Sequence, residues 1–285
     1  MPGLLSRKFE EVEGLRYDPS RDIVYLLRGY RGVRPIVGVR SILIEGDAVH
    51  LNDLMCRDEV SVGEGVIIRG NIMTGFKFTA SPGKREPSVI IGDVGVPVRG
   101  DGEAIFSVKK GSKAPLMLLG NVMAGTVKIE SPTIIIGNVV AYKELEIRSP
   151  SIILGRVLVG TKDSGGKAYL EKATFFQLYV FGDAEVGEGC TTFMPVLTSK
   201  GGDLKVRAKK IRVFNLPCMF CGETEDPLRC PYYLKGKCPL ARKGGGYDYL
   251  ADYDLSHVGD YSFVSWFWRA SPLMIVQNVL MKKLL

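Results

Sequence analysis

The stretch Ile134-Ile135-Ile136-Gly137-Asn138-Val139-Val140-Ala141 decides the fold, because its pattern returns along the chain. A run of apolar residues is followed by Gly, usually by Asn or Asp, and then by another apolar residue. The phrase surrounds seven glycines, namely Gly46, Gly70, Gly92, Gly120, Gly137, Gly155 and Gly182. Successive glycines lie 24, 22, 28, 17, 18 and 27 residues apart, with no helical pattern between them. Such a repeat predicts a chain that coils as a parallel β-helix.

Three regular turns, starting at Ala114, Ser131 and Ser149, align with six apolar columns. The columns fall in pairs two residues apart, which is the spacing of one face of a strand. They are Met117/Ile134/Ile152, Leu119/Ile136/Leu154, Val122/Val139/Val157, Ala124/Ala141/Val159, Val127/Leu145 and Ile129/Ile147. Three pairs per turn predict an all-β, triangular parallel β-helix with rungs of 17–18 residues and these six columns pointing inward.

The Gly-Asn or Gly-Asp unit lies between the first and second pair, where the chain must turn. Both residue types tolerate positive φ, so we expect them to form a corner. Two further apolar columns have the opposite parity and are expected to point outward: Leu118/Ile135/Ile153 and Met123/Val140/Leu158. An exposed patch of this kind is typical of a contact surface. The alternative is that the terminal segments of the chain cover it.

The same phrase, followed by Leu145-Glu146-Ile147, resembles the bactofilins over roughly residues 36–213. The resemblance implies a right-handed parallel β-helix, a cytoskeletal or scaffolding role, and polymers that join end to end without nucleotide. Three features depart from that family: irregular rung lengths, insertions such as 81–87 and 161–167, and a cysteine-rich C-terminal segment. We therefore expect a non-enzymatic scaffold that self-associates into small oligomers or docks protein partners.

Four cysteines lie within 21 residues, at Cys218, Cys221, Cys230 and Cys238. The first pair forms a Cys-x-x-Cys-Gly knuckle, and four thiolates so close together can enclose one tetrahedral zinc ion. An iron–sulfur cluster is the alternative, because Cys-Pro also occurs in cluster ligation. The remaining cysteines, Cys56 and Cys190, are isolated and are expected to be small core residues.

The basic residues are concentrated in one segment. Residues 204–243 hold ten basic residues against three acidic ones, which equals the whole net charge of +7. Residues 230–239 also resemble the opening of CCCH zinc fingers, which bind single-stranded RNA through aromatic and basic side chains. The alternative function is therefore an RNA- or ribosome-associated protein, or a contact with an anionic membrane surface. Candidate contact residues are Lys205, Arg207, Lys209, Lys235, Lys237, Tyr232 and Tyr233.

We expect four regions: an N-terminal capping segment (1–33), the β-helix (34–215), the zinc module (216–246), and an aromatic tail ending in a helix (247–285). The apolar run Ile23–Leu27 is expected to cover one end of the coil. Ser271-Pro272 is typical of a helix start, so a helix is expected over Leu273–Leu285.

The sequence also bears on enzymatic activity, cellular location and the type of source organism. No nucleophile–base pair or paired-carboxylate motif accompanies His50 and His257, so neither an enzyme nor a small-molecule substrate is expected. No apolar run is long enough to span a membrane, and the N-terminus has no signal-peptide core, which favours a cytoplasmic protein. Only two glutamines, Gln177 and Gln277, occur among many charged residues, a composition typical of thermophiles.

Overall fold

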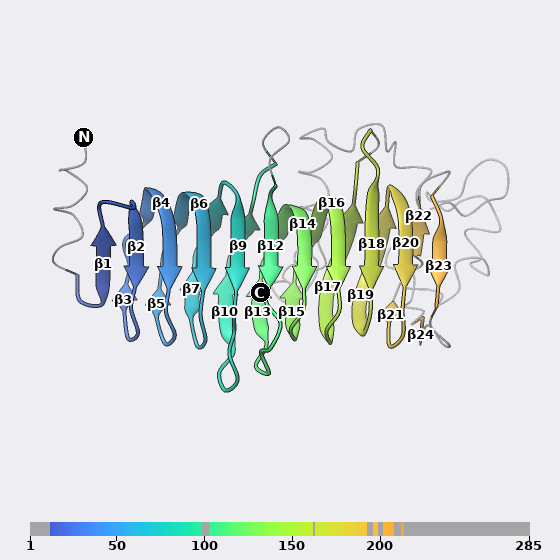
Figure 1. Cartoon of the computed structure of the whole chain (residues 1–285). Helices are drawn as coiled ribbons and strands as arrows, with labels where there is room; N and C mark the ends of the chain where they lie inside the picture. The colour runs from blue at the N-terminus through green and yellow to red at the C-terminus, as the bar shows by residue number, and fades with distance from the viewer. Residues whose placement is uncertain are drawn as a thin grey trace, which may run out of the picture.

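The computed structural model describes residues 12–98, 103–161, 163–192, 196–198, 202–207 and 212–213. These residues form a coil of about ten turns stacked along one axis (Figure 1). Each full turn passes through three short strands, and each strand pairs in parallel with the strand one turn later. The prediction of an all-β parallel β-helix is therefore confirmed. The expected zinc module and terminal helix lie outside the described residues.

The three walls of the coil are called sheets 1, 2 and 3, and several strands bend from one wall into the next. Sheet 1 contains β2 (Ile23–Leu26), the second halves of β4 (Ile36–Ile44) and β6 (Leu54–Val62), β9 (Lys77–Ala80), β12 (Ile105–Val108), the second halves of β14 (Val122–Ile129) and β16 (Val139–Ile147), β18 (Gly166–Leu170), β20 (Gly182–Val186) and β23 (Leu204–Val206). Sheet 2 contains β3 (Arg31–Gly32), β5 (Val49–His50), β7 (Ile67–Arg69), β10 (Ser88–Ile91), β13 (Leu116–Leu119), β15 (Thr133–Ile136), the first halves of β17 (Ser151–Val159) and β19 (Ala173–Val180), β21 (Thr191–Thr192) and β24 (Arg212–Val213). Sheet 3 contains the first halves of β4, β6, β14 and β16, the second halves of β17 and β19, and β8 (Ile72–Thr74), β11 (Val94–Gly95) and β22 (Val196–Thr198).

The N-terminal end of the coil is covered by a strand of opposite direction. Strand β1 (Leu15–Asp18) pairs antiparallel with β2, whereas β2 pairs in parallel with β4. The apolar run Ile23–Leu27 thus supplies the first parallel strand and is not itself the cover. The parallel coil accordingly includes part of the segment 1–33 that we expected to act only as a cap.

The core is a continuous stack of inward side chains in which residues one turn apart touch. Phe78 of β9 and Phe106 of β12 stack with ring centroids 4.9 Å apart and an interplanar angle of 13°. The inward columns predicted for sheets 1 and 3 are confirmed as fully buried or nearly so. They are Val122/Val139/Val157, Ala124/Ala141/Val159, Val127/Leu145 and Ile129/Ile147.

The parity predicted for sheet 2 is wrong. Leu118, Ile135 and Ile153, which we expected to face outward, are fully buried. The columns that we expected to face inward point outward instead: Met117/Ile134/Ile152 and Leu119/Ile136/Leu154.

Buried hydroxyl groups explain this error. Thr133 and Ser151 share an inward column with Leu116, although residues that carry a hydroxyl are mostly exposed in proteins. Thr133 Oγ1 donates to the Ser131 carbonyl oxygen at 2.9 Å, and Ser151 Oγ donates to the Ser149 carbonyl at 2.9 Å. A hydroxyl that is satisfied by the backbone of the preceding corner can be buried at little cost.

The Gly-Asn corner between sheets 2 and 3 is built by contacts between turns. A Cβ atom on Gly137 would lie 2.0 Å from the Gly120 carbonyl oxygen, so only glycine fits between the stacked corners. The next residue forms an amide ladder, in which a backbone N–H donates to the side-chain oxygen one turn earlier. The N···O distances are 2.7 Å for Asn71 to Asp53, 3.0 Å for Asp93 to Asn71, 2.8 Å for Asn121 to Asp93, 2.9 Å for Asn138 to Asn121, and 3.0 Å for Arg156 to Asn138.

We expected these polar corner residues to adopt positive φ, but most of them do not. Among the described non-glycine residues only Asp22, Asp47 and Lys172 have positive φ, and only Asp47 belongs to the repeated phrase.

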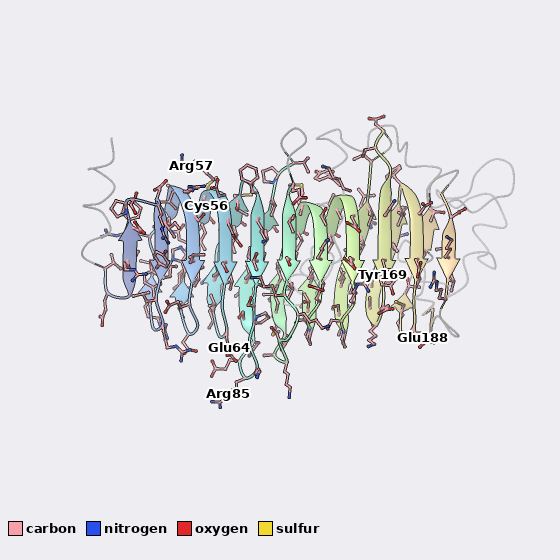
Figure 2. The ribbon with its side chains drawn as sticks, in the orientation of Figure 1. Cys56, Arg57, Glu64, Arg85, Tyr169 and Glu188 are labelled. Carbon is pink, nitrogen blue, oxygen red and sulfur yellow. The ribbon has the colours of Figure 1, made fainter. Side chains whose placement is uncertain are left out.

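The insertion 81–87 is held by one carboxylate from the preceding turn. Glu64 accepts hydrogen bonds from the backbone N–H groups of Lys84, Arg85 and Glu86. Figure 2 shows Glu64 and Arg85 along the same edge of the coil. These donors keep the pKa of Glu64 below its usual value, because they stabilise the ionised form. The loop is thus anchored to the coil although it departs from the regular rung.

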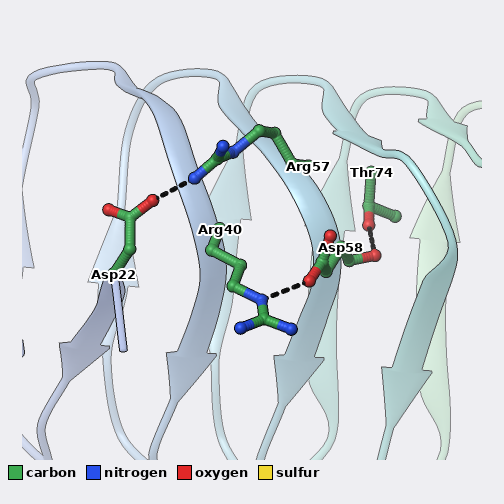
Figure 3. Close-up of polar contacts among 5 residues, drawn as sticks. All are labelled: Asp22, Arg40, Arg57, Asp58 and Thr74. Carbon is green, nitrogen blue, oxygen red and sulfur yellow. Dashed lines mark hydrogen bonds and ion pairs between the residues drawn. The ribbon is translucent and has the colours of Figure 1, made fainter. Parts of the chain in front are cut away.

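Charged side chains cross between turns near the N-terminal end of the coil (Figure 3). Asp22 pairs with Arg57, and Arg40 Nε lies 2.6 Å from Asp58 Oδ2. Thr74 Oγ1 donates to the backbone carbonyl of Asp58 at 2.5 Å. Because the arginines are mostly exposed, water screens each pair and its contribution to stability is small.

Candidate functional site

The outer side of sheet 2 carries an apolar surface that faces away from the core. Two parallel columns of side chains continue from β7 to β17 in strand register. The most exposed members are Ile91 at 43%, Ile67 at 41%, and Ile152 and Leu154 at 40% each. The full set, called the apolar face of sheet 2, is Ile67, Val89, Ile91, Met117, Leu119, Ile134, Ile136, Ile152 and Leu154.

No charged side chain interrupts either column within β10, β13 and β15. A wall of a coil that met only water would carry polar residues on its outer side, as antiparallel sheets with one solvated face do. A continuous apolar surface instead marks a place where another molecule or segment binds. In the part of the chain that the structure describes, no helix is long and apolar enough to cross a membrane.

Sheet 1 shows the opposite character on its outer side, where charges of both signs alternate between turns. Lys128 Nζ lies 4.0 Å from Glu146 Oε2 on the adjacent turn. At the C-terminal end Lys205 is in register with Glu185, and Arg207 Nε lies 3.1 Å from Glu185 Oε1. The two described members of the predicted basic group therefore share a carboxylate neighbour, and Glu185 offsets part of their charge.

The other predicted contact and metal residues fall outside the described residues. These are Lys209, Tyr232, Tyr233, Lys235 and Lys237, together with Cys218, Cys221, Cys230 and Cys238. Within the described ranges, no group of three or more His, Cys, Asp or Glu side chains is placed to hold a metal ion.

Sheet 3 carries a second apolar feature, a column with one outward residue per turn. Met123, Val140, Leu158 and Tyr179 are in direct register, and the outward direction predicted for the first three is confirmed. Val140 is only 2% exposed and Leu158 only 4%. We call the outer cluster of sheet 3 the group formed by Met123, Val140, Tyr142, Leu158, Tyr179 and Phe181.

The isolated cysteines and His50 belong to the core and its edge. Cys190 is 2% exposed, and its thiol lies 3.4 Å from the Leu170 carbonyl oxygen, which confirms it as a core residue. Cys56 is half-buried and packs against the same core. His50 is fully buried beside the ring of Tyr30, and burial lowers the pKa of its imidazole. His257 lies outside the described residues.

Sequence reasoning placed the exposed patch on the wrong columns of sheet 2. A usable signal was present, because Leu116–Leu119, Ile134–Ile136 and Ile152–Leu154 are apolar at every position. Uninterrupted apolar strands are covered on both faces in known sheets. Whichever alternate residues of such a strand point inward, the remaining ones form an apolar column on its outer side.

Comparison with known proteins adds no relative to this description. No protein-family model matches the chain. No curated protein and no solved structure shows significant similarity to it.

Proposed function

We propose that the protein is a non-enzymatic, bactofilin-like scaffold that associates with a second copy of itself through the apolar face of sheet 2. The observation that carries this proposal is the pair of uncharged columns on the outside of a single-layered wall. Burying that surface removes apolar area from water, which is the main driving force of association. The resemblance of the Gly-Asn repeat to bactofilins supports a structural role.

The geometry of the face suits a flat, self-complementary contact. Turns of a sheet are about 4.8 Å apart, so the five turns from β7 to β17 extend over roughly 19 Å. Sheets that pack face to face lie about 10 Å apart and interdigitate their side chains. A second copy supplies the same uncharged columns, and therefore neither partner buries an unpaired charge.

A two-fold axis also separates the cationic ends of the two faces. Arg69, which is exposed, ends the outward column on β7, at one end of the apolar face. When two copies pack antiparallel about a two-fold axis, Arg69 of one copy lies over the β17 end of the other. The two guanidinium groups are then separated by the length of the face, so their repulsion is small.

The double variant Ile134→Glu/Ile152→Glu tests the contact. The unmodified chain is expected to sediment as a dimer or small oligomer, and the variant as a monomer, because four carboxylates would be buried in each dimer. Analytical ultracentrifugation over a range of concentrations measures this. Met55→Glu is the matched control, since Met55 is 46% exposed on sheet 3. A monomeric unmodified chain, or a variant that still associates, would show the proposal to be wrong.

We also propose that the four C-terminal cysteines bind one zinc ion. Their spacing and the Cys-x-x-Cys-Gly knuckle support this proposal. Metal analysis of the purified full chain is expected to give about one zinc per chain, and Cys221→Ser is expected to lose most of it. Cys56→Ser is the control, because Cys56 is a half-buried residue of the coil. A brown protein with iron and acid-labile sulfide would identify the cluster instead.

A further inference from the structure

The outer cluster of sheet 3 is far more buried than its position predicts. Val37 and Met55 occupy the same outward column nearer the N-terminus and are 47% and 46% exposed. Val140 and Leu158 are 2% and 4% exposed although they point away from the main core. On a single-layered wall, an outward side chain reaches such low exposure only when other groups lie over it.

The cluster combines aliphatic and aromatic groups in a way that suits an aromatic occupant. Tyr142, Tyr179 and Phe181 belong to the cluster, and Met123 contributes a thioether 3.1 Å from Tyr142 Oη. Burial raises the pKa of the Tyr142 phenol, as expected for a ring at an apolar site. Aromatic rings and methionine sulfur attract further aromatic rings beyond the effect of buried area alone.

The described part of the chain ends on sheet 2, the wall that precedes sheet 3 in each turn. In every complete turn the chain passes from sheet 2 to sheet 3, and the last described strand, β24, ends at Val213 on sheet 2. Residues 214–285 follow it. The turn of β22 lies three turns beyond the turn of β16, or about 14 Å along the axis. The segment 214–246 is long enough to cover that distance.

The final residues have the composition of a segment that needs a partner surface. Apolar side chains dominate 273–285, and the preceding stretch is rich in aromatic rings. The aromatic residues are Tyr247, Tyr249, Tyr253, Tyr261, Phe263, Trp266, Phe267 and Trp268. So many aromatic side chains are rarely left in water, because their burial supplies a large hydrophobic gain.

We propose that the aromatic segment 247–285 packs against the outer cluster of sheet 3 of its own chain. The segment covers the cluster on the turns of β14 to β19 and leaves the apolar face of sheet 2 open. This inference is independent of the proposed self-association, because the two surfaces lie on different walls. It assigns the two apolar surfaces to different occupants, one within the chain and one outside it.

The two tryptophans of the chain, Trp266 and Trp268, both lie in this segment, so tryptophan fluorescence of the full-length protein reports on it alone. In the unmodified chain the emission is expected at short wavelength and shielded from acrylamide. Leu158→Glu places a charge in the outer cluster and is expected to shift the emission to longer wavelength and to raise the quenching constant several-fold. Tyr142→Lys, at the partly exposed rim of the cluster, is expected to do the same if Leu158→Glu folds poorly.

Ile152→Glu is the matched control, because Ile152 lies on the outside of sheet 2. It is expected to weaken self-association and to leave the tryptophan emission unchanged, which separates the two proposals. Emission that stays the same in both Leu158→Glu and Tyr142→Lys, while circular dichroism shows a folded coil, would overturn the inference. A shift with Ile152→Glu in place of Leu158→Glu would place the segment on sheet 2.

Discussion

Ile135→Asp is expected to destabilise the coil strongly, whereas the neighbouring substitution Ile136→Asp is not. Ile135 is fully buried on the inner side of β15, and an aspartate there would have no partner for its carboxylate. We expect a loss on the order of 4 kcal/mol, measured by chemical denaturation. Ile136 points outward on the apolar face of sheet 2, so its substitution should change self-association more than stability.

The pair of variants also tests the parity of sheet 2 directly. Ile135→Val is a further control, expected to cost about 0.5–1.5 kcal/mol through the lost methylene. Equal losses in Ile135→Asp and Ile136→Asp would contradict the assignment of these two residues to opposite sides of the wall. Because the comparison is between adjacent residues of one type, it does not depend on the size of the protein's total stability.

Gly137→Ala is expected to lower stability, although the same exchange usually stabilises a strand. Gly137 has no positive φ, and alanine would normally be preferred there by about 0.5–1 kcal/mol. In this protein its Cβ would lie 2.0 Å from the Gly120 carbonyl oxygen. The two turns would have to move apart by about 1 Å, as contacts below 3 Å are repulsive. We expect the free energy of unfolding, measured by guanidinium denaturation, to fall by about 3 kcal/mol or more.

Gly111→Ala is the control that separates the steric clash of a Cβ at Gly137 from the strain of a positive φ. Gly111 has φ of 104°, and no atom lies within 4 Å of its missing Cβ. Its substitution should cost roughly 1–2 kcal/mol from the positive φ alone. If Gly137→Ala were as stable as the unmodified chain, the stacked corner would be looser than the structure shows.

The repeated phrase was sufficient to predict the coil, its three walls and the inward columns of sheets 1 and 3. On sheet 1, for example, the buried residues Val127 and Ile129 flank the polar, outward Lys128, so the alternation distinguishes inside from outside. On sheet 2 the run Ile134-Ile135-Ile136 is apolar at every position, and the deciding residue is the buried Thr133. Its hydroxyl is satisfied by a backbone carbonyl of the corner, a contact that composition does not reveal.

The role of the corner residues was also hidden from sequence reasoning. Asn and Asp after Gly suggested a backbone conformation, but Asn121 and Asn138 serve as acceptors for an amide one turn later. That role requires knowing which residues stack across 17 or 18 positions. The candidate surface on sheet 2 follows from the corrected parity. The cysteine prediction concerns residues outside the described ranges, and so does the RNA prediction except for Lys205 and Arg207; both stay predictions.

The amide ladder repeats from turn to turn, so the length of the coil can change by whole turns. Each inner corner from Asn71 to Asn138 accepts a hydrogen bond from the turn after it and donates one to the turn before it. Internal gain or loss of one whole unit leaves equivalent joints on both sides, and changes the distance between the two ends by about 4.8 Å. The length of the coil therefore depends on how many such units the chain contains.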